Sequence, residues 1–282
     1  MRKLVLLAAL LLPLSAFAQQ FGARASMEAD VKIKKGLHVS AEEEIRVGAG
    51  KPGIDNVRST LGVTWKASDY FKFGAGYTLI NPYKFKYDDE GALTYKGYWY
   101  PRHRLFADAT ASVDLGDFRV SLKERFQFTH RTDDSLNVYQ STRNALALKS
   151  RIGVKYKGYK DWYRIEPFGY FELRTALNDP WGETVGDIQQ TENSKRNYFE
   201  YNHTGYTHIY NNRYRVNLGV DWTPFKHNTL TANVLLDFCS DYEIDTNGPS
   251  NWGDKGVRLF VDNTGWHDYF CASLCVSYKI SF

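Results

Sequence analysis

A histidine-containing stretch in the C-terminal third of the chain, EYNHTGYTHIYNNRY from 200 to 214, carries the residue types most suited to catalysis. A histidine two residues before a serine can activate that hydroxyl as a nucleophile, and an amide such as Asn212 can orient the histidine. The residue two positions after His203 is Gly205, which has no hydroxyl. Thr204 is adjacent, but neighbouring side chains of a strand point to opposite faces. We therefore expect that the protein is not an enzyme.

The same stretch resembles the His-x-Ser segment of outer-membrane phospholipase A and of the lipid A deacylase barrels. The resemblance is confined to this stretch and ends at Gly205, where those enzymes carry the nucleophile. It implies, as an alternative function, a lipid-acting barrel hydrolase that uses His203.

An acidic stretch, SDYEIDTNG, raises the question of a metal site. Its residues Asp241, Glu243, Asp245 and Asn247 fall on one side of a strand, and oxygen ligands suit calcium. Same-side residues of a strand lie about 7 Å apart, too far to share one ion unless the chain curls. We expect no metal site and no cofactor.

Segment 81–100 is rich in aromatic side chains that could contact a partner. Exposed aromatic rings offer flat apolar surfaces to a sugar or to another protein. The candidate contact residues are Tyr83, Tyr87, Tyr95, Tyr98, Trp99 and Tyr100. The alternative is that these rings pack on one another and close one end of the fold.

The segments that must position these residues alternate between apolar and polar side chains. In the last fourteen residues, YFCASLCVSYKISF, even positions are apolar and odd positions are almost all polar. The same alternation, typical of strands, marks residues 21–33, 37–47, 57–66, 70–80, 101–114, 117–130, 142–156, 161–176, 205–223 and 228–242. Globular strands average about five or six residues, whereas membrane-spanning strands need about 9–11. We predict an all-β fold, a transmembrane antiparallel up-and-down barrel of ten to twelve strands.

The connections between these segments support the barrel. Short turns at 115–117, 157–160 and 223–226 alternate with long segments, as periplasmic turns and outer loops do in outer-membrane barrels. Aromatic residues lie beside the short turns on the apolar face, where a membrane interface would suit them. They are Trp65, Phe71, Phe118, Tyr156, Tyr163, Trp222, Tyr278 and Phe282.

The number of alternating segments is eleven, whereas bacterial barrels normally have an even number of strands. Two explanations are open. Either one strand escapes the pattern, or segment 21–33 is not a strand of the barrel wall and instead covers an edge or crosses the lumen.

The N-terminus indicates export. Arg2 and Lys3 precede an apolar run, and Ala16 and Ala18 form the small-residue pattern of a signal-peptide cleavage site. We predict a signal peptide at 1–18 and a barrel at 19–282, located in the outer membrane of a Gram-negative bacterium. The expected partners are outer-membrane lipid and lipopolysaccharide, with a glycan or protein at the outer loops. The net charge of +4 is too small to indicate nucleic-acid binding.

The polar faces of the strands should line the lumen, and they carry charges of both signs. The predicted lumen charge network comprises Arg104, Asp108, Arg125, Arg151, Arg164, Glu166, Glu172, Arg215 and Asp237. Side chains fill the interior of small barrels, and wide aqueous pores need about sixteen strands. We expect a plugged lumen; the alternatives are a narrow channel for small solutes and a ligand site in the lumen.

Three motifs, RHRLFADATASV (102–113), EPFGYFEL (166–173) and RYRVNLGVDWTPFKHNTLTANV (213–234), carry a wider resemblance. They are similar to a family of outer-membrane barrels of Gram-negative anaerobes that is described only as a domain of unknown function. This resemblance extends over nearly all of 19–282 and implies the fold and the location, but no catalytic residues. The terminal Phe282 also resembles the C-terminal signature of bacterial outer-membrane proteins, which implies the barrel assembly machinery as a partner during insertion.

Overall fold

The computed structural model describes residues 20–48, 53–87, 93–134, 136–159, 163–190, 197–253 and 256–282. The predicted signal peptide, 1–18, lies outside these residues. The strands are β1 (Gln20–Lys34), β2 (Leu37–Gly48), β3 (Ile54–Lys66), β4 (Phe71–Tyr87), β5 (Leu93–Trp99), β6 (Arg102–Leu115), β7 (Phe118–Arg131), β8 (Asn144–Tyr156), β9 (Ile165–Gln190), β10 (Asn197–Phe225), β11 (Asn228–Gly253) and β12 (Gly256–Ser281). Among the described residues, no helix has the length and apolar character needed to cross a membrane.

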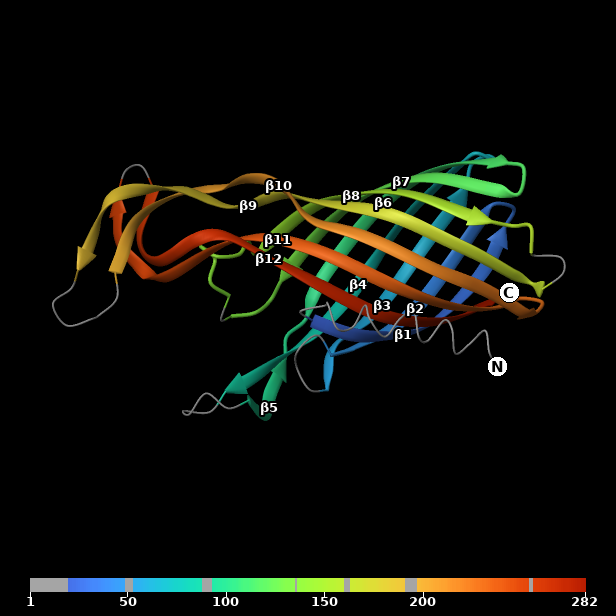
Figure 1. Ribbon diagram of the computed structural model, residues 1–282, viewed down its shortest axis with the longest axis horizontal. Helices are drawn as coiled ribbons and strands as arrows, with labels where there is room; N and C mark the ends of the chain where they lie inside the picture. The colour runs from blue at the N-terminus through green and yellow to red at the C-terminus, as the bar shows by residue number, and fades with distance from the viewer. Residues whose placement is uncertain are drawn as a thin grey trace.

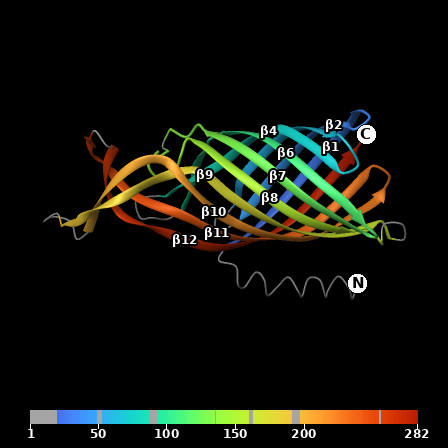
Figure 2. The same ribbon diagram turned by 90° about the horizontal axis from the view of Figure 1, so that it is seen from above.

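Every strand except β5 takes part in one closed barrel, seen from the side in Figure 1 and from above in Figure 2. Sequential strands pair antiparallel from β1 to β4, β4 pairs with β6, and the pairing continues in order to β12. β5 forms a hairpin with the end of β4 and lies outside the wall. The predicted all-β barrel of ten to twelve strands is confirmed.

The barrel closes through one parallel pair of strands, β1 and β12. The Ser26 hydroxyl donates to the Ser277 hydroxyl across this seam at 2.8 Å, and Lys279 Nζ lies 2.8 Å from Glu28 Oε1. An odd number of wall strands leaves the first and last running in the same direction, so only a parallel pair can close the ring. The second explanation for the odd count is therefore wrong, and the first is correct only in that a strand was missed. Residues 21–33 do form a wall strand, and the strand that the pattern missed, β5, is not in the wall.

Short turns gather at one end of the barrel, which we call the turn end. Two residues connect β1 to β2, β6 to β7 and β10 to β11. Gly116 in the second of these turns has φ +60°, a conformation that costs glycine little because it has no Cβ. The β8–β9 connection, 157–164, is longer than the sequence pattern indicated. The opposite end carries the remaining connections, including the one between β7 and β8, and we call it the loop end.

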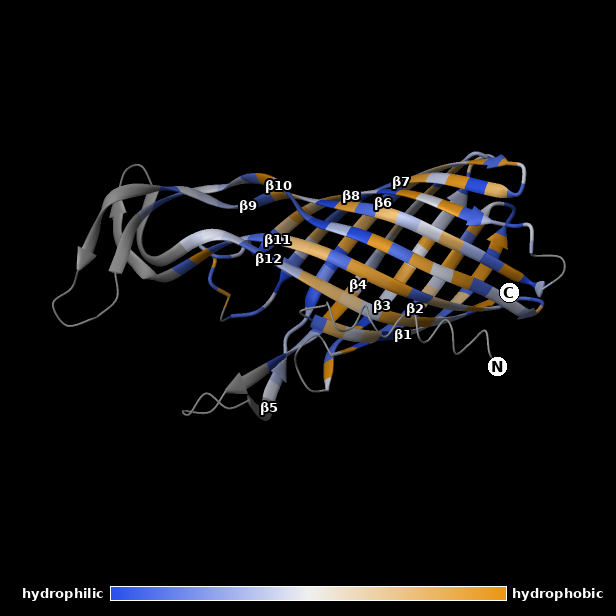
Figure 3. Ribbon diagram, viewed as in Figure 1, coloured by the Kyte–Doolittle hydropathy of each residue, from blue (hydrophilic) through white to orange (hydrophobic). Residues whose placement is uncertain are grey.

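Hydropathy alternates along the strands, as the stripes of Figure 3 show, and the exposed positions are mainly apolar whereas the less exposed positions are mainly polar. Typical outward side chains are 52–61% exposed: Leu61, Leu105, Leu122, Ile152, Leu218 and Val276. Buried inward side chains include Glu172, Arg215, Asn217 and Asp237. Water-soluble proteins place these residue types the other way round.

The aromatic residues predicted beside the short turns do lie at the turn end. Six of them are large exposed rings: Trp65, Phe71, Phe118, Tyr163, Trp222 and Phe282. Tyr156 and Tyr278 are half-buried; the ring of Tyr156 contacts that of Phe118, and the Tyr278 hydroxyl donates to Asn228 Oδ1.

Strands β9 to β12 are 26–29 residues long and continue past the barrel at the loop end (Figure 1). In this projecting part, which we call the extension, β10 also pairs with β12. Register shifts interrupt the β9–β10 pairing repeatedly between 199 and 213. The extension contacts the connection between β7 and β8, where the Tyr206 hydroxyl donates to the Val138 carbonyl at 3.0 Å.

Candidate functional site

The most concentrated chemistry lies in the lumen, around Glu172 of β9. This carboxylate is 2% exposed and is shared by four cations from two strands, β8 and β10. Arg151 donates two hydrogen bonds to its Oε2, at 2.6 and 3.0 Å. Nitrogens of Lys149, Arg213 and Arg215 lie 3.7–3.9 Å from its Oε1. One negative charge therefore serves four positive charges.

Two further carboxylates complete this arrangement. Asp237 of β11 accepts a two-pronged bond from Arg215, at 2.6 and 2.7 Å, and lies 3.6 Å from Arg24. Asp108 of β6 meets Arg125 at 2.6 Å and Lys123 at 3.2 Å. We call the set a charge layer, comprising Arg24, Asp108, Lys123, Arg125, Lys149, Arg151, Glu172, Arg213, Arg215 and Asp237.

On the turn-end side of Glu172 and Asp237 the lumen holds a cavity of about 430 Å³, which we call the lumen cavity. Its acidic lining is limited to two carboxylates, Glu42 and Glu44. Its cationic lining is Arg24, Arg46, Arg58, Arg104, Arg125, Lys149, Arg151 and Arg215. The cavity is therefore strongly cationic.

Two phenylalanines in the lumen-cavity lining are accommodated by glycines on neighbouring strands. A Cβ at Gly76 would collide with the ring of Phe106, and a Cβ at Gly219 would collide with that of Phe168. The Arg125 guanidinium lies 4.3 Å from the Phe106 ring centroid, and the Arg151 guanidinium lies 3.9 Å from that of Tyr170. Such cation–π contacts hold guanidinium planes in fixed orientations.

Most of the predicted lumen network comes together. Asp108, Arg125, Arg151, Glu172, Arg215 and Asp237 all lie in the charge layer, and Arg104 lines the lumen cavity.

The prediction for Arg164 needs correction. Arg164 is exposed in the β8–β9 turn, with φ +56°, and its Nη1 donates to the Pro224 carbonyl at 2.6 Å. Glu166 belongs to the inward series of β9, as predicted, and pairs in register with Asp221 near the turn end. The alternation rule fails at Arg164 because that residue precedes the strand.

Arg213 is a member of the charge layer that sequence reasoning missed. It belongs to the same inward series as Arg215, so the period-2 pattern of β10 contained the signal. Its Nε is buried without a hydrogen-bond partner among the described residues.

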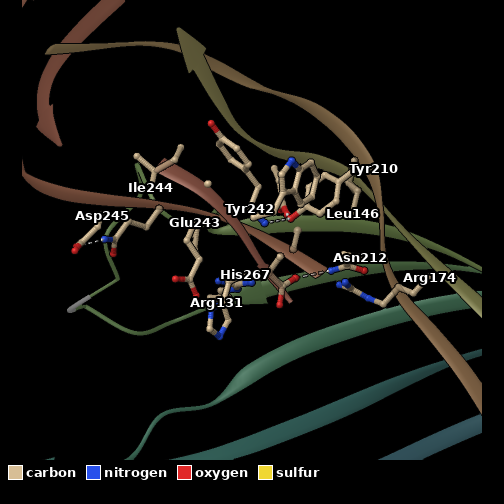
Figure 4. Close-up of a pocket in the computed structure, with 17 residues that line it drawn as sticks. Arg131, Leu146, Arg174, Tyr210, Asn212, Tyr242, Glu243, Ile244, Asp245 and His267 are labelled. Carbon is tan, nitrogen blue, oxygen red and sulfur yellow. Dashed lines mark hydrogen bonds between the residues drawn. The ribbon is translucent and has the colours of Figure 1, made fainter. Parts of the chain in front are cut away.

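A second cavity, of about 740 Å³, lies where the extension meets the barrel, and we call it the mouth cavity (Figure 4). It is lined by four carboxylates, Asp179, Asp241, Glu243 and Asp245, and by two arginines, Arg131 and Arg174. Its polar groups are bonded to one another: Tyr210 donates to Asp179 at 2.7 Å, and Asn212 donates to Asp241 at 3.2 Å. The mouth cavity is thus acidic, opposite in sign to the lumen cavity.

His203 lies in the extension, within an aromatic cluster. Its ring contacts those of Tyr139 and Tyr206 edge-on, each at 5.4 Å between centroids, and its Nδ1 has no hydrogen-bond partner among the described residues. The Thr204 hydroxyl points elsewhere and donates to the Trp181 carbonyl at 3.2 Å. Burial lowers the pKa of His203 below 6.5.

The lowered pKa predicts that acid destabilises the extension. The unfolded chain binds a proton at His203 before the folded chain does, so the free energy of unfolding should fall as the pH drops below about 6.5. Tyrosine and tryptophan fluorescence during denaturant unfolding, measured at pH 7.5 and 5, would show this loss. His203→Phe should remove the contribution of His203 to the pH dependence of the free energy of unfolding. An unchanged pH dependence in that variant would contradict a buried neutral histidine.

The predicted aromatic contact residues divide into two groups. Tyr83 packs edge-on against Trp99 at 5.0 Å, and Tyr98 lies 6.1 Å from Tyr100. Trp99 is nevertheless 47% exposed. Tyr87 and Tyr95 lie outside the residues whose side chains are described. The hairpin thus combines rings that pack together with an accessible indole.

Within the described part of the chain, no group of three or more His, Cys, Asp or Glu residues is arranged to hold a metal ion. The acidic residues of SDYEIDTNG instead contribute to the mouth cavity, where Asp241, Glu243 and Asp245 line its wall.

A model of the family described as "Protein of unknown function (DUF2490)" matches residues 21–189. The match covers more than half of the chain and extends from β1 almost to the end of β9, including Asp108, Arg151 and Glu172 of the charge layer. No curated protein matches the chain. The resemblance to an uncharacterised family is confirmed, and the chain belongs to the DUF2490 family, proteins of unknown function, of which this one is a closed β-barrel.

Proposed function

We propose that the protein is a non-enzymatic outer-membrane barrel of a Gram-negative bacterium whose lumen is closed to the flow of ions. The observation that carries this proposal is the position of the charge layer. On β9, β10 and β11, Glu172, Arg213 and Asp237 lie between residues that line the mouth cavity and residues that line the lumen cavity. Paired charges at this level obstruct the axis that a channel would need.

The outer face supports a membrane location. Its apolar side chains are exposed along the wall, and aromatic rings gather at the turn end, as expected at a lipid interface. Two carboxylates interrupt this face, and each accepts a hydrogen bond from a serine of the neighbouring strand. Ser59 donates to Glu43 at 3.0 Å, and Ser150 donates to Glu124 at 2.6 Å. These bonds reduce the cost of placing a carboxyl group next to lipid.

The two cavities form a second barrier to ions. The acidic mouth cavity repels anions, and the cationic lumen cavity below it repels cations. An ion of either sign would meet one unfavourable field on its path through the barrel, which adds to the obstruction at the charge layer but does not close the lumen by itself. This arrangement favours a closed lumen over a narrow channel.

The surroundings of His203 support a non-enzymatic role. The ring lies among tyrosines rather than beside an aligned hydroxyl, and the Thr204 hydroxyl is bonded to a main-chain carbonyl. A lipid-acting hydrolase would need a nucleophile within hydrogen-bond reach of the imidazole.

Liposome swelling tests whether uncharged solutes pass the charge layer. Proteoliposomes that contain the purified full-length barrel are diluted into iso-osmotic L-arabinose. We expect them to swell no faster than protein-free liposomes, because side chains obstruct the lumen at Glu172 and Asp237. A swelling rate that rises with the amount of barrel would contradict the proposal and support a narrow channel.

The β4–β5 hairpin supports a second role, contact with a glycan or protein at the outer surface, because Trp99 is exposed there. With purified lipopolysaccharide as the probe, we expect Tyr98→Ala with Trp99→Ala to weaken binding about tenfold, as loss of aromatic hot-spot residues does. Trp65→Ala, which removes an exposed indole at the turn end, is the matched control. Equal binding by both variants would refute a contact at this hairpin.

A further inference from the structure

Cationic side chains lie side by side in the lumen in a way that is unfavourable without a counter-charge. Arg125, Lys149, Arg174 and Arg213 are successive register partners across β7, β8, β9 and β10. Like charges placed directly opposite one another on neighbouring strands are destabilising. A row of four such residues is therefore stable only if negative charge lies nearby.

The carboxylates of the chain supply only part of that charge. The lumen cavity and the charge layer together contain ten cationic side chains and five carboxylates, an excess of five positive charges. The carboxylates are Glu42, Glu44, Asp108, Glu172 and Asp237. Glu172 already serves four cations, so it cannot fully neutralise any one of them.

The shortage of carboxylates in the lumen is clearest at Arg104. Its Nε donates to the Thr129 hydroxyl at 2.9 Å, and it forms no ion pair with the described carboxylates. Arg58 is only slightly better placed, with its Nε donating to Asn56 at 2.9 Å and lying 3.8 Å from Glu44. Both line the lumen cavity, so both can present guanidinium nitrogens to a molecule inside it.

The size and chemistry of the lumen cavity define what would fit. Its volume of about 430 Å³ lies within the range of small-molecule pockets, about 300–1,000 Å³. Guanidinium groups bind the oxygens of phosphate and carboxylate groups through paired hydrogen bonds. Stacking on Phe106 and Tyr170 already orients the guanidinium groups of Arg125 and Arg151. The barrel wall separates the cavity from surrounding lipid, which favours a soluble ligand over a lipid headgroup.

We propose that the lumen cavity is a binding site for a small soluble polyanion that carries phosphate or carboxylate groups. The ligand supplies the negative charge that the lumen lacks and bridges arginines from strands that face one another across the cavity. Arg58 and Arg104 contact it directly, since neither is committed to a primary ion pair. This inference concerns the same lumen as the proposed function, but it requires only that the barrel folds, because a conducting barrel could bind the anion equally well.

Calorimetric titration of the purified full-length barrel in detergent tests this site, with inorganic pyrophosphate and citrate as probes. We expect saturable binding of at least one probe and a higher melting temperature when it is bound. Sodium chloride at matched ionic strength should give neither effect. The site is refuted if both probes fail to bind, or if chloride raises the melting temperature equally. In the second case, salt only screens the repulsion among the lumen cations.

Arg104→Gln separates a binding role from a structural one. Loss of one charge-assisted contact should weaken binding about tenfold. In the absence of the anion the same variant should melt at a higher temperature than the parent, because it relieves repulsion among the lumen arginines. Arg119→Gln is the matched control, since Arg119 is paired with Asp114 outside the lumen cavity. Equal affinity of the two variants would overturn the proposal.

Discussion

Glu172→Gln is expected to be the most destabilising conservative substitution in the barrel. Glutamine keeps the shape of the side chain but removes the one charge that Lys149, Arg151, Arg213 and Arg215 share. Breaking a buried ion pair by neutralising one partner costs about 3–5 kcal/mol, because the remaining charge stays buried without compensation. Denaturant unfolding of the detergent-solubilised barrel, followed by circular dichroism, measures the loss.

Two comparisons show whether this loss comes from the shared charge. Glu243→Gln removes the same charge from an exposed position at the mouth cavity and should leave the free energy of unfolding almost unchanged. Arg151→Gln added to Glu172→Gln should recover part of the loss, because residues within one charge network couple in double-mutant cycles. Equal stability of Glu172→Gln and the parent would show that Glu172 does not hold the charge layer together.

Removal of both Arg215 and Asp237 should produce a barrel that conducts ions. Their two-pronged ion pair joins β10 to β11 at the edge of the lumen cavity that faces the mouth cavity, and both side chains are buried. Arg215→Ser with Asp237→Ser shortens both side chains and leaves no unpaired charge from that pair. We expect planar bilayers that contain this variant to show discrete current steps, because the side chains that obstruct the axis at this level are removed.

The control for this variant is Arg119→Ser with Asp114→Ser. It removes an exposed ion pair of the same type, with 2.7 Å between Nε and Oδ1, near the turn end of the wall. We expect no current steps from the control. Steps from both double variants would mean that destabilisation of the barrel, rather than opening of the charge layer, produces the current.

The period-2 pattern carries most of the barrel architecture. It located all eleven wall strands, because an inward polar residue and an outward apolar residue alternate wherever the wall is regular. It missed β5 and the outer halves of β9 to β12. Register shifts between 199 and 213 break the alternation there, so pattern reasoning ended β9 at 176 and began β10 at 205. The parallel closure was missed because nothing local in β1 specifies its partner.

The lumen residues were predictable as a set but not as pairs. Alternation placed Glu172, Arg215 and Asp237 inside, yet their contacts depend on the register between strands far apart in sequence. Arg164 was assigned inward because it falls within the alternating segment 161–176, but it lies in a turn before β9 begins, where alternation does not hold. The sequence does not show at which position along the barrel axis each inward charge lies. The excess of positive charge in the lumen cavity is therefore visible only in the structure.

Single-channel recording of the purified protein in planar bilayers tests the closed lumen most directly. Correct insertion is verified independently by the β-sheet circular dichroism and protease resistance of the same preparation. The charge layer around Glu172, set between cavities of opposite charge, leads us to expect no reproducible current steps from the unmodified barrel. Steady steps of uniform size would contradict this account, and the arginines of the lumen cavity would then form the selectivity filter of a channel.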